Sequence, residues 1–163
     1  MNRTFLKSLL PLLLLATLAS AQSSSDKPDF SGRWRMQKDK SEFSGFKIPD
    51  IVTRTVEQHG VIMNVHTVQT AGEKTAIADV TYSIDGTPTE NVVNGRDAES
   101  KTFWDGAILV VRTTMKTAKG DPELIEDRWA LSDDKQTLTT TSHIETEKGD
   151  VDMTMVCSRQ TGQ

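Results

Sequence analysis

The chain has 163 residues, with 19 lysines and arginines against 23 aspartates and glutamates, and its formal net charge is −4. Nucleic acids and anionic membranes bind basic surfaces, so this composition argues against both as partners. The length suits one domain of ordinary size once a short leader is set aside.

The first 21 residues have the composition of a secretory signal peptide. Arg3 and Lys7 form a positive amino-terminal region, and the apolar run LLPLLLLATLA that follows is too short to span a bilayer comfortably. Residues 19–21, Ala-Ser-Ala, supply a small-residue cleavage site, so we expect cleavage before Gln22 and export to the periplasm or the medium. The mature chain then holds 17 basic and 23 acidic residues, a net charge of −6.

The remaining chain divides into a linker and one domain. Residues 22–28, QSSSDKP, are polar and carry no packing signal, so we expect a disordered linker followed by a single domain over residues 29–163. The only cysteine is Cys157, so no disulfide can form within the chain. It alternates with Met153 and Met155, a pattern that favours a buried, unreactive thiol over a nucleophile.

Most of the domain has the period of two that is typical of β-strands. A short first strand is expected over residues 32–36, followed by a loop with at most one helical turn, because Pro49 would stop a helix. From Ile51 onward, runs rich in Val, Ile, Thr and aromatic residues are separated by short turns. These runs cover residues 51–58, 61–69, 75–84, 90–93, 99–104, 107–115, 123–131, 136–144 and 150–159.

The turns indicate how the strands are joined. The pairs at residues 85–86 (Asp-Gly), 94–95 (Asn-Gly) and 105–106 (Asp-Gly) are strong hairpin signals, because glycine accepts the positive φ of tight turns. Strands joined in this way form an antiparallel up-and-down meander. A long meander exposes two edges unless it closes, so we predict an all-β barrel of about 8–10 strands.

The alternation also predicts which side chains face the barrel interior. Asp127, Thr140 and Ser142 fall on the same side as the apolar set, and only 36% of the chain is hydrophobic, so the interior resembles a ligand cavity more than a dry core. The alternative is a one-residue shift in register at a bulge. The expected ligand-binding residues are Tyr82, Leu109, Val111, Asp127, Trp129, Met153 and Met155.

One further pattern joins the first strand to the last. Gly32 lies two residues before Trp34. The glycine allows a positive φ or close packing of the backbone, while the Trp34 indole covers the floor of the barrel. The last strand ends at Arg159, and its guanidinium is placed to stack on that indole if the two strands are neighbours.

These residues resemble the signature of the calycin superfamily, which unites lipocalins with intracellular fatty-acid-binding proteins. The Gly32-x-Trp34 start and the arginine at the end of the last strand carry the likeness, over roughly residues 30–159. The turns in DGAILVV and SDDKQTL are similar to hairpins of the fatty-acid-binding branch, and FSGRW and DKSEFSG to small exported bacterial proteins of lipocalin-like type. The resemblance implies a lipocalin-like barrel that binds a small hydrophobic or amphipathic molecule.

The chain departs from the fatty-acid-binding branch in two places. That branch has a two-helix lid between its first two strands, for which the residues between Met36 and Ile51 are too few. It also holds the ligand carboxylate with an Arg-x-Tyr pair on the last strand, where the resemblance places Met155 and Cys157. We therefore expect no basic clamp on the ligand, so that apolar contact dominates binding and salt has little effect on it.

No constellation of residues indicates an enzyme, a cofactor or a metal. His59, His66 and His143 do not have metal-ligand spacing, and His143 is expected on the outer face. An inward Asp127 could act as a general base, although a buried acid satisfied by its neighbours explains it as well. The strands lack the aromatic girdles of membrane barrels. We expect no enzymatic activity, no cofactor, no metal and no membrane insertion; the alternatives to a carrier are a packed barrel that binds an unidentified protein partner and a small enzyme.

Overall fold

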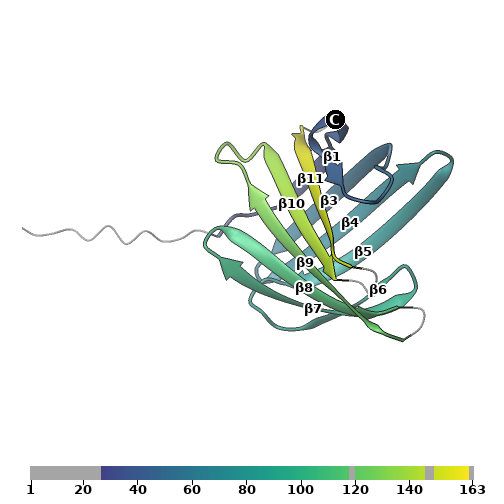
Figure 1. The fold of residues 1–163 in the computed structure, drawn as a ribbon. Helices are drawn as coiled ribbons and strands as arrows, with labels where there is room; N and C mark the ends of the chain where they lie inside the picture. The colour runs from purple at the N-terminus through teal and green to yellow at the C-terminus, as the bar shows by residue number, and fades with distance from the viewer. Residues whose placement is uncertain (1–26, 118–119, 146–148, 162–163) are drawn as a thin grey trace, which may run out of the picture.

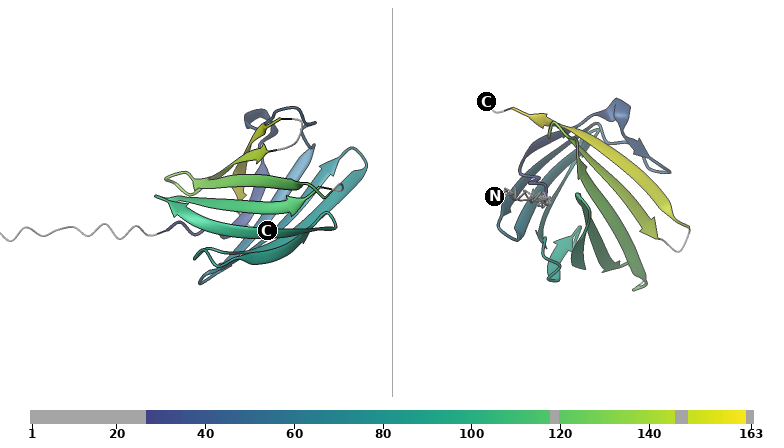
Figure 2. Two further views of the ribbon diagram at one scale, coloured as in Figure 1. Left: turned by 60° about the horizontal axis from the view of Figure 1, so that its bottom comes forward. Right: turned by 90° about the vertical axis from the view of Figure 1, so that its left-hand side faces the viewer.

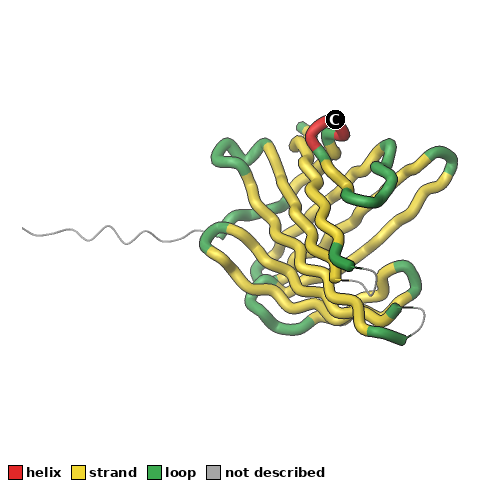
Figure 3. Tube along the Cα trace, viewed as in Figure 1, coloured by secondary structure: helices red, strands yellow, loops and turns green. Residues whose placement is uncertain are grey.

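Antiparallel β-strands make up almost all of the computed structural model, which describes residues 27–117, 120–145 and 149–161 (Figure 1). The predicted signal peptide and residues 22–26 of the predicted linker lie outside the described residues. Figure 3 shows one short helical turn, η1 (Lys38–Lys40), among the strands. None of the described helical segments has the length and hydrophobicity to cross a membrane. The strands are β1 (Gly32–Met36), β2 (Glu42–Phe43), β3 (Ile51–His59), β4 (Ile62–Ala71), β5 (Lys74–Ser83), β6 (Thr89–Val93), β7 (Arg96–Asp105), β8 (Ile108–Lys116), β9 (Pro122–Leu131), β10 (Thr137–Glu145) and β11 (Val151–Gln160).

The strands form one continuous sheet that curves into a barrel. Its order is β5-β4-β3-β1-β11-β10-β9-β8-β7-β6, with β2 paired to β11 (Figures 1 and 2). The predicted meander is confirmed, and so is the role of the first strand, because β1 lies between β3 and β11. At this seam Trp34 pairs with Arg54 on one side and with Arg159 on the other.

Two of the three predicted tight hairpins are present. Asn94 and Gly95 both have positive φ, 52° and 76°, and join β6 to β7. Gly106, with φ of 61°, lies in the turn between β7 and β8. These are the conformations for which Asn-Gly and Asp-Gly pairs are selected.

The prediction of a tight hairpin at Asp85-Gly86 is wrong. β5 and β6 lie at opposite ends of the strand order and share no ladder. The Asp85 carboxylate accepts hydrogen bonds from Ser83 Oγ (2.7 Å) and from the amide of Thr87 (2.9 Å), and Pro88, which lacks an N–H, follows. This loop turns the chain away from β5 before a ladder can form.

A side chain of β6 bridges β5 and β6, the two strands that share no backbone ladder. The Asn91 carboxamide on β6 accepts a hydrogen bond from the backbone amide of Thr81 (2.8 Å) and donates one to the Thr81 carbonyl (3.0 Å). A single amide side chain therefore stands in for one residue of a neighbouring strand. The barrel is closed at this point by local side-chain bonds rather than by a backbone ladder.

The segment between β1 and β3 is short, as predicted, with a single helical turn. It also contains β2, which the sequence did not predict. Ser41 Oγ donates to the Gln37 carbonyl (2.8 Å) and accepts from the Val156 amide (3.0 Å), which holds the segment on β11. The Asp50 carboxylate accepts from Lys38 Nζ (3.0 Å) and from the Gly72 amide (2.7 Å). These bonds hold residues 37–50 beside the turn between β4 and β5.

The strand register follows the predicted alternation without a one-residue shift. Trp129 pairs with Leu109 and with Thr140, and all three are buried. His143 pairs with Glu126 and Asp152 on the outer face, as expected. Cys157 is buried, and this burial raises the pKa of its thiol, in keeping with an unreactive cysteine.

Candidate functional site: the two ends of the barrel

One end of the barrel is filled by aromatic side chains and is called the closed end. It is the end with the turns between β3 and β4, β7 and β8, and β9 and β10; the last two lie at the left of Figure 1. The Phe30 ring stacks on Trp104 with centroids 6.1 Å apart and meets Trp129 edge-on at 5.9 Å. Lys27, in the stretch predicted as linker, places its Nζ 5.1 Å from the Trp104 ring centroid. The indole Nε1 of Trp34 donates to the Phe30 carbonyl (3.0 Å).

The predicted stacking at the seam is present at this end. The Arg159 guanidinium carbon lies 4.2 Å from the centroid of the Trp34 ring, and Trp34 is only 1% exposed. Arg159 also donates hydrogen bonds to the carbonyls of Ser31 (2.7 Å) and Lys135 (2.8 Å). Gly32 has φ of 142°, and a Cβ there would collide with Arg159 Nη1. Glycine is therefore required both by the backbone and by the arginine that crosses it.

The opposite end, called the open end, has the turns between β4 and β5 and between β6 and β7, together with residues 37–50. By register, Ile125, Met153 and Met155 face the interior there, yet each remains partly exposed. Ile125 and Met153 lie within three residues of the start of their strands, so solvent reaches these inward side chains from the open end. The open end is therefore packed unevenly: Val52, Ala98 and Met115 are buried there, whereas the accessible space beside Ile125, Met153 and Met155 is called the hollow.

The predicted ligand-binding residues all face inward but divide between the two ends. Leu109 and Val111 are fully buried, and Tyr82 and Trp129 are nearly so. The other three, Asp127, Met153 and Met155, are partly exposed and so accessible to a molecule in the hollow. The role of the seven as ligand-binding residues stays a prediction.

Polar groups lie where the two ends meet. Ser142 Oγ donates a hydrogen bond to the Asp127 carboxylate. Burial raises the pKa of Asp127, while the Ser142 hydrogen bond and the nearby Arg54 guanidinium act in the opposite direction. Burial, reinforced by the Asp127 charge, raises the pKa of the Tyr82 phenol, against a smaller opposite effect of Arg54. The three side chains therefore interact electrostatically with one another.

Arg54 is the interior residue that the sequence reasoning missed. It lies on β3 with its guanidinium carbon 4.6 Å from the centroid of the Trp129 ring. Its Nε donates to Thr67 Oγ1 (3.3 Å) and its Nη1 to Thr140 Oγ1 (3.2 Å). The interior thus contains a basic group, although Met155 and Cys157 on the last strand, the expected clamp positions, carry none. The signal was present in residues 52–56, VTRTV, where the arginine has the same phase as two buried valines.

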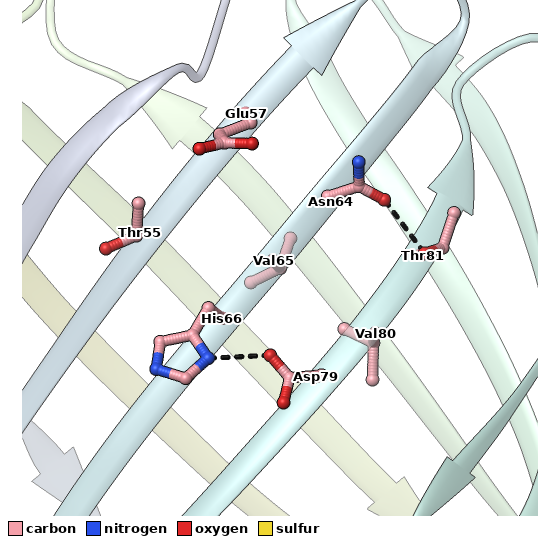
Figure 4. A pocket seen from close by; sticks show the side chains of 8 residues that line it. All are labelled: Thr55, Glu57, Asn64, Val65, His66, Asp79, Val80 and Thr81. Atoms are coloured by element: carbon pink, nitrogen blue, oxygen red, sulfur yellow. Dashed lines mark hydrogen bonds and ion pairs between the residues drawn. The ribbon is translucent and has the colours of Figure 1, made fainter.

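Two pockets lie along the strands of the barrel. One, of about 350 Å³, lies over β3, β4 and β5, where His66 Nδ1 is 2.6 Å from Asp79 Oδ1 and Thr81 donates to Asn64 (Figure 4). Thr55, His66 and Asp79 are paired across these strands on the outward phase, so their side chains face away from the interior. The other, of about 850 Å³, is lined by residues of β6, β7 and β8. Within the described part of the chain, no three His, Cys, Asp or Glu residues are grouped to hold a metal.

Comparison with known proteins finds similarity in structure only. No family model and no curated protein sequence matches the chain. A secretory abundant heat soluble protein of Ramazzottius varieornatus superposes with a TM-score of 0.58 at 14% identity, over 80% of this chain and 94% of its own. Lipid binding protein 8 of Caenorhabditis elegans gives 0.58 at 12% identity, over 80% and 95%.

A third similar structure is a zebrafish ileal bile acid-binding protein complexed with cholic acid, with a TM-score of 0.52 at 14% identity, over 80% of this chain and 98% of its own. The chain has a calycin fold. At these identities the likeness establishes the calycin barrel alone, and it confirms the fold that the Gly32-x-Trp34 and Arg159 positions suggested. The calycin barrel here lacks a two-helix lid, because residues 37–50 contain only η1 and β2.

Proposed function

We propose that this calycin barrel is a binding protein that takes up a small hydrophobic or amphipathic molecule through its open end. The observation that carries the proposal is the partial exposure of Ile125, Met153 and Met155 on the inner side of the sheet. Exposed apolar surface inside a concave wall gains free energy when an apolar molecule covers it. The similar structures include a lipid binding protein and a bile acid-binding protein, which supports the same class of ligand.

The loop at the open end fits this role. Phe43 pairs with Met153, and Phe43 and Ile48 both pack against the buried core while remaining partly exposed. Residues 37–50 thus supply two apolar side chains at the rim of the hollow. A ligand that enters there meets apolar surface before it reaches the polar groups below.

The test is binding of Nile red, an uncharged dye whose fluorescence rises in apolar surroundings. We expect saturable binding by the wild-type protein and its loss in Met155→Trp, because the larger side chain occupies the hollow. The matched control is Thr141→Trp, since Thr141 lies on the neighbouring strand β10, is exposed and faces outward. Circular dichroism melts establish that both variants are folded.

The opposite result has a defined meaning. If the dye does not bind and Met155→Trp unfolds the protein, the interior is a packed core. The barrel would then act through its outer surface on a protein partner, which is the alternative that the sequence left open.

We also propose that the protein is exported and acts without catalysis. The leader in residues 1–21 supports export. The Asp127 carboxylate is held by the Ser142 hydroxyl, and no metal grouping lies among the described residues. Expression of the full chain in a bacterial host, followed by amino-terminal sequencing of the exported product, should give Gln22 as the first residue. Retention of the intact leader on cytoplasmic protein would contradict export.

A further inference from the structure

We propose that the molecule bound in the barrel carries an uncharged polar group that both donates and accepts hydrogen bonds, such as an amide, and that Arg54, Tyr82, Asp127 and Trp129 recognise it. These four residues are called the interior polar cluster. The proposal rests on the proposed function and deepens it by naming the chemistry of the ligand.

Two members of the cluster have unused hydrogen-bonding capacity. The indole Nε1 of Trp129 is buried without a hydrogen-bond partner among the described residues, and the whole side chain is only 2% exposed. The Tyr82 hydroxyl likewise makes no hydrogen bond to another described residue. Buried donors are nearly always paired in proteins, so an unpaired indole N–H beside a hollow marks the place of an absent acceptor.

The cluster lies at the bottom of the accessible interior. Trp129 belongs to the packed end, whereas Asp127, two residues before it on the same face of β9, is partly exposed. Arg54 lies over the Trp129 ring, and the Tyr82 ring centroid is 6.5 Å from that of Trp129 in an edge-on arrangement. A molecule that fills the open end therefore reaches these four residues with its leading group.

The cluster contains one basic and one acidic side chain that do not form an ion pair. Among the described residues, no carboxylate lies within 4 Å of the Arg54 guanidinium, whose bonds go to two threonine hydroxyls. The other inward charges lie at the ends of the barrel: by register Lys74, Arg96 and Glu123 are at the open end, and Arg159 is at the closed end. The middle of the interior thus holds one basic and one acidic side chain, each with capacity for a further partner.

This balance selects against charged head groups. A carboxylate would be attracted by Arg54 but repelled by Asp127. An ammonium group would be attracted by Asp127 but repelled by Arg54. An amide satisfies both, since its carbonyl oxygen accepts from Arg54 and Trp129 while its N–H donates to the Asp127 carboxylate. Buried polar groups that are all satisfied contribute specificity, because any analogue that lacks one partner leaves a group unpaired.

The test compares three amphiphiles with the same chain length as competitors of bound Nile red: decanamide, decanoate and decylamine. At pH 8, which favours the carboxylate form of Asp127, we expect the wild-type protein to bind decanamide at least tenfold more tightly than either charged compound. In Asp127→Asn the middle of the interior becomes positive, so decanoate should gain at least tenfold relative to decanamide. In Arg54→Gln the gain should go to decylamine instead.

The matched control is Glu126→Gln, which removes one negative charge from the adjacent residue on the outer face of β9. It should leave the order of the three affinities unchanged. Nile red binding and thermal melts of each variant establish that it is folded and still takes up an apolar molecule.

Two outcomes would overturn the proposal. One is a wild-type protein that prefers decanoate, and the other is a set of affinities that neither Asp127→Asn nor Arg54→Gln reorders while Nile red still binds. Failure of Nile red to bind the wild-type protein would instead contradict the proposed function itself, so the two failures are distinguishable.

Discussion

The two ends of this barrel are built from the same strands but are packed differently. At the closed end Trp34, Leu109, Trp129 and Leu138 face inward and are at most 2% exposed. At the open end the same strands present Asp127, Met155 and other side chains that solvent can reach. The difference shows that a single sheet can pack its inward side chains tightly at one end and leave some of them accessible to solvent toward the other.

The seam explains why the closed end can be sealed. Arg159 lies across Gly32 onto Trp34 and bonds to two carbonyls from separate turns, so it joins the first strand, the last strand and the turn after β9. The open end has no comparable plug among its described residues; of residues 37–50, Phe43 and Ile48 pack against the core while remaining partly exposed. The closed end should therefore determine stability, and the open end should determine what is bound.

The largest effect is expected from Trp34→Ala, which should lower the free energy of unfolding by about 3–5 kcal/mol, as for a buried aromatic residue lost from a core. Arg159→Ala should cost less, and the two effects should not add, because the guanidinium and the indole are stacked. Urea denaturation of the two single variants and the double variant measures this. Additive effects would show that the stacking contributes nothing.

A pair of truncations compares the two ends directly. Leu138→Ala at the closed end should cost about 2–5 kcal/mol, because the surrounding side chains cannot collapse into the space. Met155→Ala at the open end should cost less than about 1 kcal/mol, since its side chain is already partly solvated. Urea midpoints at a common slope give both values. Equal costs would mean that the two ends are packed alike.

Tryptophan fluorescence separates the ends during binding. Trp129 lies beneath the hollow, whereas Trp34 is sealed under Arg159. A bound apolar quencher should therefore reduce the emission of a variant that retains only Trp129 severalfold more than that of a variant that retains only Trp34. Equal quenching of the two variants would place the probe outside the barrel.

The cysteine tests the packing beside the seam. Cys157 is 1% exposed and burial raises its thiol pKa, so it should react with Ellman's reagent at a negligible rate in native buffer and rapidly in denaturant. A serine variant, Cys157→Ser, gives the background of the assay. Rapid labelling of the folded protein would mean that this part of β11 opens readily.

The smallest expected effect is a change in the pKa of His143, which lies on the outer wall of the barrel. A hydrogen bond from His143 Nδ1 to Asp152 (2.8 Å) raises the pKa of the imidazole above its usual value. A raised folded-state pKa stabilises the protein below the ordinary pKa of the unfolded histidine, and this contribution is lost as the pH rises through the folded-state value. An NMR titration should give a His143 pKa above that in Asp152→Asn; identical values would contradict the interaction.

Local sequence patterns determined most of the architecture. The alternation from Ile51 onward assigned inner and outer faces correctly, because side chains of a strand point alternately to the two sides whatever its partners are. The positive-φ turn at Asn94 and Gly95 is equally local. The Gly32-x-Trp34 spacing, taken with Arg159 at the end of the last strand and their resemblance to the calycin signature, indicated the seam.

Only the tertiary structure decided which inward residues form a core and which line a hollow. Met155 and Leu138 have the same phase, but the curvature of the sheet and the aromatic plug leave one accessible and bury the other. The contact of Arg54 on β3 with Trp129 on β9, and the closure of the barrel through Asn91, join strands that are distant in sequence. Alternation fixes the direction of a side chain, whereas its depth and its neighbours depend on how the whole sheet closes.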